Sequence, residues 1–363
     1  MKTLIFLLFL LAQPAFSYPE MVRHGYPACA TCHTSPDGGG VLTEYGRVLS
    51  EQLLSTWAKE GEGRFLYGAV SFPNWISMNG DVRFVETYNK PVSTPATSSL
   101  IFMEADLETA LRYDKFELVG TLGYQDDQGS TFPDMVLSRR HYLMYRPTEK
   151  SSIRAGRFFS AYGLRTPDHI QETERNLGWD ERGETYNLEI YYLGESYEVF
   201  LTGILGRPDS SVLDVEKGAA LRGALFHNDK SKFGASFYVG SNALQSREVY
   251  GPYAIFGITP KMVALLEADI QHLTPAGGTM TTGLFTYAKL SYEVAKGVLP
   301  FLSQENGLED LSARGNTYRY TYGIGLQWFP RPHFDFQITL QHQNRSAPRG
   351  DRNYGWLMMH AYL

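Results

Sequence analysis

The chain is poor in cysteine and nearly devoid of long apolar runs. Cys29 and Cys32 are the two cysteines among 363 residues, which excludes a disulfide-rich scaffold and a four-cysteine zinc site. After residue 12, no segment is apolar enough for a transmembrane helix of about 20 residues. Lys and Arg number 33 against 39 Asp and Glu, so net charge gives no electrostatic reason to expect nucleic-acid binding.

The one strongly apolar stretch lies at the N-terminus, in MKTLIFLLFLLAQPAFSYPE. Lys2 supplies the positive start, and an apolar run from Leu4 to Ala12 follows. Ala15 and Ser17 are small residues at the −3 and −1 positions of a signal-peptidase site. The pattern predicts a signal peptide over residues 1–17 and a mature, exported chain that begins at Tyr18.

Both cysteines belong to a Cys-x-x-Cys-His motif, Cys29 to His33. A disulfide here would constrain little chain, a redox-active pair is expected near a βαβ pattern that the chain lacks, and zinc would need two more nearby ligands. The adjacent His33 instead indicates one covalent c-type haem. We expect Cys29 and Cys32 to form the thioethers and His33 to be the proximal iron ligand.

The sixth iron ligand is left open by the sequence. Methionine and histidine are the usual axial partners, and His24 and Met21 lie just upstream of the motif. Met78 lies where the chain turns to a strand pattern. A vacant site or a histidine from a partner protein would also satisfy the pattern.

A loop and one helix are predicted after the motif. The run PDGGG, residues 36–40, cannot hold a regular element. Residues 41–61 then carry apolar side chains at helical spacing, with Gly46 as the one weak position. The predicted apolar face consists of Leu42, Tyr45, Leu49, Leu53 and Trp57.

The remaining sequence, from about Trp75, has the period of β-strands. In HFDFQITLQHQN, residues 333–344, apolar and polar side chains alternate. Such segments run for about nine to fifteen residues, longer than the usual strand of a soluble sandwich and suited to a tilted membrane-spanning strand. We count about sixteen strands, with roughly 14–18 allowed. They are expected to begin near Trp75, Ser98, Lys115, Val136, Ser152, Glu184, Ser196, Val215, Lys232, Glu248, Lys261, Met280, Gly297, Thr317, His333 and Arg352.

The links between these strands alternate in length, which is typical of outer-membrane barrels with short periplasmic turns and long outer loops. Aromatic residues near strand ends agree with the aromatic girdles of such barrels. The chain ends on Leu363 rather than on the aromatic residue usual in porins. The aromatic residues near strand ends include Tyr88, Tyr113, Tyr124, Tyr145 and Trp328.

One long link, Ser160–Gly183, is rich in charges of both signs. It is either a surface loop or a loop folded into the lumen, as the third outer loop often is in porin-like barrels. Nowhere in the chain is there a nucleophile–base arrangement, a phosphate-binding glycine loop or a paired-carboxylate signal. We therefore expect a protein that is not an enzyme.

The layout resembles monohaem cytochrome–porin fusions, in which an exported Cys-x-x-Cys-His segment precedes a porin-like barrel. It implies an all-β membrane protein: a signal peptide (1–17), a monohaem c-type cytochrome segment (18–62) and an antiparallel outer-membrane β-barrel (63–363). The haem is expected on the periplasmic side of a bacterial outer membrane, in contact with lipid. It would take part in electron transfer with periplasmic electron carriers or multihaem cytochromes. The alternative is a solute porin whose haem segment plugs or gates the pore or senses redox state. The oligomeric state is left open.

Overall fold

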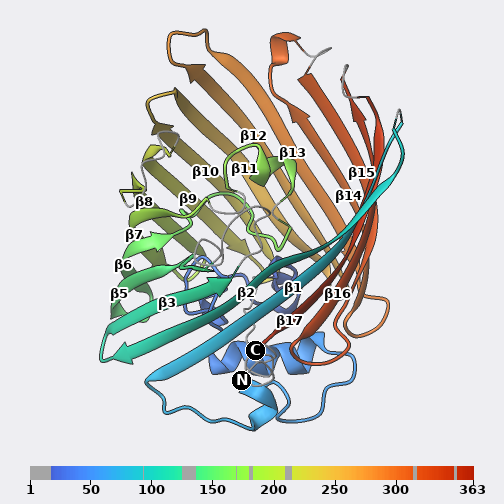
Figure 1. Cartoon of the computed structure of the whole chain (residues 1–363). Coiled ribbons are helices and arrows are strands. Elements are labelled where there is room, and N and C mark those ends of the chain that lie inside the picture. Colours follow the sequence, from blue (N-terminus) through green and yellow to red (C-terminus); the bar gives the residue numbers. More distant parts are fainter. Residues whose placement is uncertain are drawn as a thin grey trace.

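The computed structural model describes residues 18–92, 94–124, 136–168, 170–179, 183–208, 215–313, 317–346 and 350–363. The predicted signal peptide therefore lies outside the described residues. An N-terminal part with short helices leads into a long antiparallel sheet (Figure 1). The helices are η1 Pro19–His24, η2 Cys29–Thr31, α2 Glu44–Leu49, η3 Ser50–Leu54, η4 Phe65–Gly68, α4 Glu172–Arg175 and η5 Leu311–Ala313. The strands are β1 Ile76–Pro91, β2 Thr97–Tyr113, β3 Phe116–Tyr124, β4 Val136–Leu137, β5 His141–Thr148, β6 Ser151–Phe158, β7 Thr185–Leu193, β8 Tyr197–Gly206, β9 Lys217–His227, β10 Ser231–Ser241, β11 Gln245–Thr259, β12 Met262–Pro275, β13 Thr281–Tyr292, β14 Val298–Leu308, β15 Tyr318–Trp328, β16 Phe334–Arg345 and β17 Arg352–Tyr362.

The sheet closes into a barrel. Successive strands pair antiparallel along the chain, and β1 pairs with β17 from Asp81↔Tyr362 to Pro91↔Arg352. The short β4 and the longer β5 both pair with β3, so they are two pieces of one strand. Across the described ranges the barrel thus has sixteen strands, which confirms the predicted fold class.

The break between β4 and β5 has an electrostatic cause. Arg139 Nε lies 3.0 Å from Asp106 Oδ2, and Arg140 Nε lies 2.9 Å from Glu108 Oε1. Asp106 and Glu108 both face the lumen from β2, where they are buried. Two consecutive arginines cannot both point inward from a regular strand, because successive side chains alternate between faces. The chain leaves the sheet at this point so that both ion pairs can form.

Burial runs opposite to that of a soluble β-protein. On β16, Asp335, Gln337 and Thr339 are buried, whereas Ile338 and Leu340 are 43% and 54% exposed. The predicted alternation is therefore confirmed, with its apolar face outward and its polar face in the lumen. This is the arrangement of a barrel surrounded by lipid. None of the described helices has the length and apolar character needed to cross a membrane.

The predicted helix after the haem motif is shorter than expected, and its apolar face is partly wrong. It runs from Glu44 through η3 to Leu54. Thr56 and Trp57 then donate their backbone N–H groups to Phe329 and Pro330, in the turn between β15 and β16, at 2.8 and 3.0 Å. These two N–H groups therefore bond to the turn between β15 and β16 instead of to carbonyls of a continuing helix. Leu42 and Leu49 are buried as predicted, but Tyr45 and Trp57 are 50% and 58% exposed.

The segment 18–62, called the N-terminal segment below, lies at the short-turn end of the barrel and partly inside its lumen (Figure 1). Basic side chains of the wall reach it, among them two on β5 and β6. Arg146 Nη2 donates to Thr34 O at 2.6 Å, and Arg154 Nη1 donates to Ser35 Oγ at 2.8 Å. Near the chain end, the hydroxyls of Ser50 and Tyr362 lie 2.9 Å apart. The N-terminal segment is therefore hydrogen-bonded to the barrel wall and occupies part of the lumen.

The long link enters the lumen, which resolves the question left open by the sequence. Residues 160–168 and 170–179, called the lumenal loop below, hydrogen-bond to inward-facing side chains. Tyr162 Oη donates to Asp269 Oδ1 at 2.7 Å, and Leu164 N donates to Glu267 Oε1 at 3.1 Å. Glu172 accepts from Arg319 Nε at 3.0 Å. His169, Asp180, Glu181 and Arg182 lie outside the described residues.

Candidate functional site

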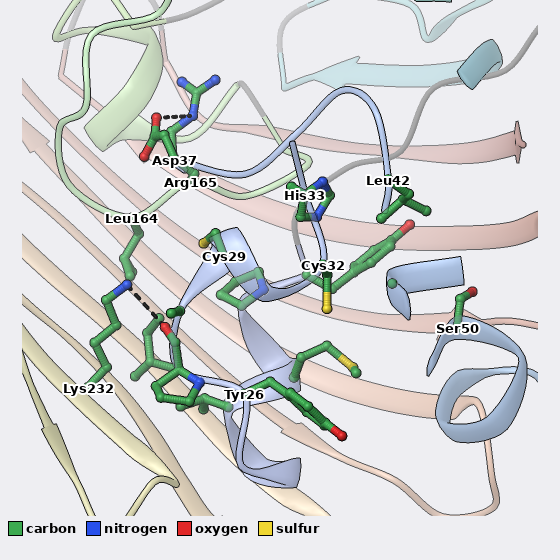
Figure 2. Close-up of a pocket in the computed structure, with 18 of the residues that line it drawn as sticks. Tyr26, Cys29, Cys32, His33, Asp37, Leu42, Ser50, Leu164, Arg165 and Lys232 are labelled. Carbon is green, nitrogen blue, oxygen red and sulfur yellow. Dashed lines mark hydrogen bonds and ion pairs between the residues drawn. The ribbon is translucent and has the colours of Figure 1, made fainter. Parts of the chain in front are cut away.

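A cavity opens at the Cys-x-x-Cys-His motif. It contains about 900 Å³ of empty space, including its opening to solvent. Cys29, Cys32 and His33 all line it, and Figure 2 shows the Cys32 sulfur pointing into the space between Tyr26 and Ser50. The wall on β9–β11 and the lumenal loop complete the lining. The motif therefore faces an enclosed space within the barrel.

Three glycines shape the loop that holds His33. Gly38, Gly39 and Gly40 have φ angles of 87°, 70° and 64°, a left-handed conformation that other residues rarely adopt. The loop returns to the motif through a backbone hydrogen bond from Thr34 N to Val41 O at 2.9 Å. The run PDGGG is thus the turn that brings His33 beside Leu42.

The surroundings of the two thiols favour their neutral form. Cys29 and Cys32 are not joined in a disulfide. Burial, and then the nearby Cys29, raises the pKa of Cys32 to about 12, and burial likewise raises the pKa of Cys29. Redox-active and metal-binding cysteines need the thiolate, which this site disfavours. A thioether carries no charge and fits the same surroundings.

His33 is buried and neutral. Burial, followed by the charge of Arg140, lowers the pKa of His33 to about 4, while the backbone at Gly39 and Gly40 acts in the opposite direction. Neutral imidazole is the form that binds metal ions. Among the described residues, His33 Nδ1 has no hydrogen-bond partner although it is buried. An orphaned buried ring nitrogen in a cavity is what an absent ligand would leave.

The sixth-ligand candidates are placed differently by the fold. Met21 lines the same cavity as Cys29, Cys32 and His33, packed against the cluster of Leu54, Leu299 and Phe329. His24 is not among the lining residues. Met78 is in β1, where its carbonyl accepts a hydrogen bond from Arg47. The cavity thus favours Met21.

Three cationic side chains, Arg165, Arg222 and Lys232, line the cavity. Arg222 Nη1 lies 2.5 Å from Asp37 Oδ1, and Lys232 Nζ forms an ion pair with Glu198 and donates to Pro27 O at 3.3 Å. Arg222 Nε is buried and has no hydrogen-bond partner in the described part of the chain. The donor set, the neutral thiols and the cavity therefore fit a haem that would be bound through Cys29 and Cys32, and these cations would balance part of its negative charge.

The sequence did not reveal these wall residues. Their inward orientation follows from strand alternation, but their position opposite the motif depends on where the N-terminal segment docks. Asp37 carried a weak signal, since it is an acid within a glycine-rich loop one turn from His33.

Gly46 is required for close packing of α2 on the motif. A Cβ on Gly46 would meet the carbonyl oxygen of Cys32 and lie 3.0 Å from Cys32 Cα. Thr43 caps the helix by accepting a hydrogen bond from Gly46 N at 3.1 Å. The glycine that weakens the helix in isolation therefore lets the helix contact the motif.

We expect Gly46→Ala to loosen the N-terminal segment by about 1–3 kcal/mol, the usual cost of overpacking. Helix propensity alone predicts the opposite sign, because alanine is favoured over glycine by about 1 kcal/mol. Hydrogen exchange of residues 26–54 in the purified protein measures the difference. Gln52→Ala, at an exposed position of the same helix, is the matched control. Increased protection in Gly46→Ala would contradict the packing argument.

Comparisons with known proteins bear on the barrel. No family model matches the chain, and no curated protein matches it. The fold is similar to that of an anion-selective porin from Comamonas acidovorans, with a TM-score of 0.63 and 10% identity over 79% of this chain and 99% of the porin. It is also similar to a loop-deletion mutant of OmpT, an outer membrane protein of Vibrio cholerae, with a TM-score of 0.64 and 11% identity over 79% and 99% of the two chains. The outer membrane channel DcaP of Acinetobacter baumannii matches with a TM-score of 0.58 and 14% identity over 79% and 97%. The chain thus has the fold of outer-membrane porins.

The similarities to these porins and channels cover about four-fifths of the whole chain. At such low identity they establish the fold alone. The haem motif and its cavity are therefore argued from the residues themselves.

Proposed function

We propose that the chain is a porin-like barrel of the bacterial outer membrane whose lumen is plugged by an N-terminal segment carrying one c-type haem. The observation that carries the proposal is the position of Cys29, Cys32 and His33, which face one cavity inside the barrel. The fold shared with an anion-selective porin and an outer membrane channel supports a role at the pore. The plug lies at the short-turn end, which is the periplasmic end in outer-membrane barrels.

Control of solute passage is the function that we infer for this plug. The N-terminal segment and the lumenal loop both occupy the lumen, which is an open water channel in porins of about 16 strands. A haem bound at Cys29 and Cys32 would supply a one-electron centre in contact with the segment. Its redox state would be linked to how the segment docks, through the Asp37–Arg222 contact beside the cavity.

A second candidate, electron transfer, is favoured by the rigidity of the plug. The pair Arg23–Glu293, at 2.6 Å, joins the segment to the turn between β13 and β14, and Glu20–Lys289, at 2.8 Å, joins it to β13. A segment tied to the wall by buried ion pairs holds a haem in one place, which suits electron exchange with periplasmic carriers. A hydrocarbon layer of about 25–30 Å exceeds what a single haem can bridge, so a conduit would need further haems from a partner.

Conductance measured in both redox states separates the two functions. The purified haem-loaded protein is inserted in planar bilayers and recorded under a reductant and then under an oxidant. Gating predicts a reversible change of conductance between the two conditions. Electron transfer predicts a closed pore in both, together with haem-dependent dye reduction when an electron-donor protein and a redox dye are added on the same side of the bilayer, because one haem cannot carry electrons across it. A pore that conducts equally in both redox states, without dye reduction, would contradict both functions.

A further inference from the structure

A second cavity lies between the barrel wall and the lumenal loop. It contains about 390 Å³ of empty space, including its opening. Strands β13–β16 form its wall, and residues 166–168 of the lumenal loop cover it. Inward-facing Gly323 makes room at the wall, because a Cβ there would meet Ser303 Oγ and lie 2.9 Å from Gln341 Cγ. The space is therefore built into the strands and the loop together.

The glutamine side chains around this cavity donate their N–H groups to oxygen atoms of neighbouring side chains. Gln341 Nε2 donates to Glu305 Oε1 at 3.3 Å, Gln337 Nε2 to Thr339 Oγ1 at 3.2 Å, and Gln327 Nε2 to Asp335 Oδ2 at 3.4 Å. The amide oxygen of Gln341 is the group left to meet a ligand. Gln341 is 6% exposed, and its Oε1 has no partner among the described residues.

The charges at this cavity are mainly negative. Asp168 and Glu305 line it, and in the described part of the chain neither forms a salt bridge. Lys289 also lines it, but its ammonium group pairs with Glu20 of the N-terminal segment at 2.8 Å. The cavity thus has two carboxylates and at least one buried orphaned acceptor, while its nearest cation is already paired.

We propose that this cavity binds a small cation that carries N–H groups, either ammonium or a short primary alkylammonium. A site rich in acceptors and in negative charge is complementary to a ligand that offers donors and positive charge. The Tyr287 ring in the lining adds a face that attracts cations, whereas the Phe301 ring is already covered by the Lys289 ammonium group, 4.7 Å from the ring centroid. This site does not depend on the haem.

Isothermal titration of the full-length protein in detergent with methylammonium chloride tests the proposal, with potassium chloride and methanol as comparison ligands at constant ionic strength. We expect saturable methylammonium binding, and at least tenfold weaker binding of both comparison ligands. Glu305→Gln should weaken methylammonium binding tenfold or more, and so should Gly323→Ala, which keeps every charge but fills the space. Asp229→Asn, at an exposed turn, is the matched control and should bind as the wild type does.

Each other outcome overturns the proposal. Equal binding of potassium would mean that charge alone is recognised, and equal binding of methanol would mean that charge is not needed. Unsaturable methylammonium titration would show that the cavity is not a site. Wild-type affinity in a folded Glu305→Gln variant would place the binding elsewhere, with heat-modifiable migration on electrophoresis as the test of folding.

Discussion

Replacing both cysteines, Cys29→Ala with Cys32→Ala, is expected to abolish haem staining of the denatured protein completely. The wild type should keep its haem through acid–acetone extraction and SDS electrophoresis, because thioether bonds survive both treatments. The two thiols line the cavity beside His33, and they are the only cysteines in the chain. No other residue offers a thiol to a haem vinyl group.

The same double variant should still form a barrel. The strand contacts do not involve the motif, and β1 closes on β17 over eleven register pairs. Heat-modifiable migration checks this point, and it separates loss of haem from loss of fold. The matched control is Ser55→Ala, which leaves every thiol in place. Haem that remains bound to the double variant after denaturation, or haem that is extracted from the wild type, would refute covalent attachment.

Releasing the N-terminal segment is expected to raise single-channel conductance from a leak to the level of an open porin. The expected increase is on the order of tenfold or more, because barrels of this strand number enclose an aqueous channel. The variant combines Glu20→Gln, Arg23→Gln and Asp37→Asn. These changes remove the segment's side of three buried ion pairs, with Lys289, Glu293 and Arg222. Breaking one buried pair costs about 3–5 kcal/mol, so three exceed what the remaining hydrogen bonds can hold.

Lys59→Gln with Glu60→Gln, at exposed positions of the same segment, is the matched control and should conduct as the wild type does. Haem staining of the triple variant shows that the cofactor is still attached, and protease cleavage of the segment shows that it has left the lumen. If the segment is released and conductance is unchanged, the lumenal loop closes the pore by itself and the plug has another role.

The strands could be predicted because each carries its own signal. Alternation places Asp335, Gln337 and Thr339 on one face of β16 whatever its neighbours are, and the observed strand begins at Phe334, one residue from the predicted start. The predicted start at Val136 is also correct, but the strand breaks after Leu137 and resumes at His141, and the sequence did not predict this break. That break arises from ion pairs of Arg139 and Arg140 with β2, a contact between segments that local periodicity does not contain.

The site was predictable only where its chemistry is contiguous. Cys29, Cys32 and His33 stand together in the sequence, and their spacing indicates haem attachment. Arg222 and Lys232 lie about two hundred residues further along, on strands whose register and position around the barrel decide what they face. Met21 could not be preferred over His24 without the fold, because both lie upstream of the motif at similar distances.

Several contacts of the N-terminal segment join residues at opposite ends of the chain. The Tyr18 hydroxyl donates to Asp335, and the Ser50 hydroxyl meets that of Tyr362, at sequence separations of 317 and 312 residues. Contacts of such separation form late in folding, since the intervening chain must be ordered first. The segment therefore docks only after β16 and β17 are in place, although it precedes the barrel in the sequence. Until then Cys29 and Cys32 remain outside any enclosed lumen, and under the proposed function this interval is the time at which a haem would reach them without passing through the finished barrel.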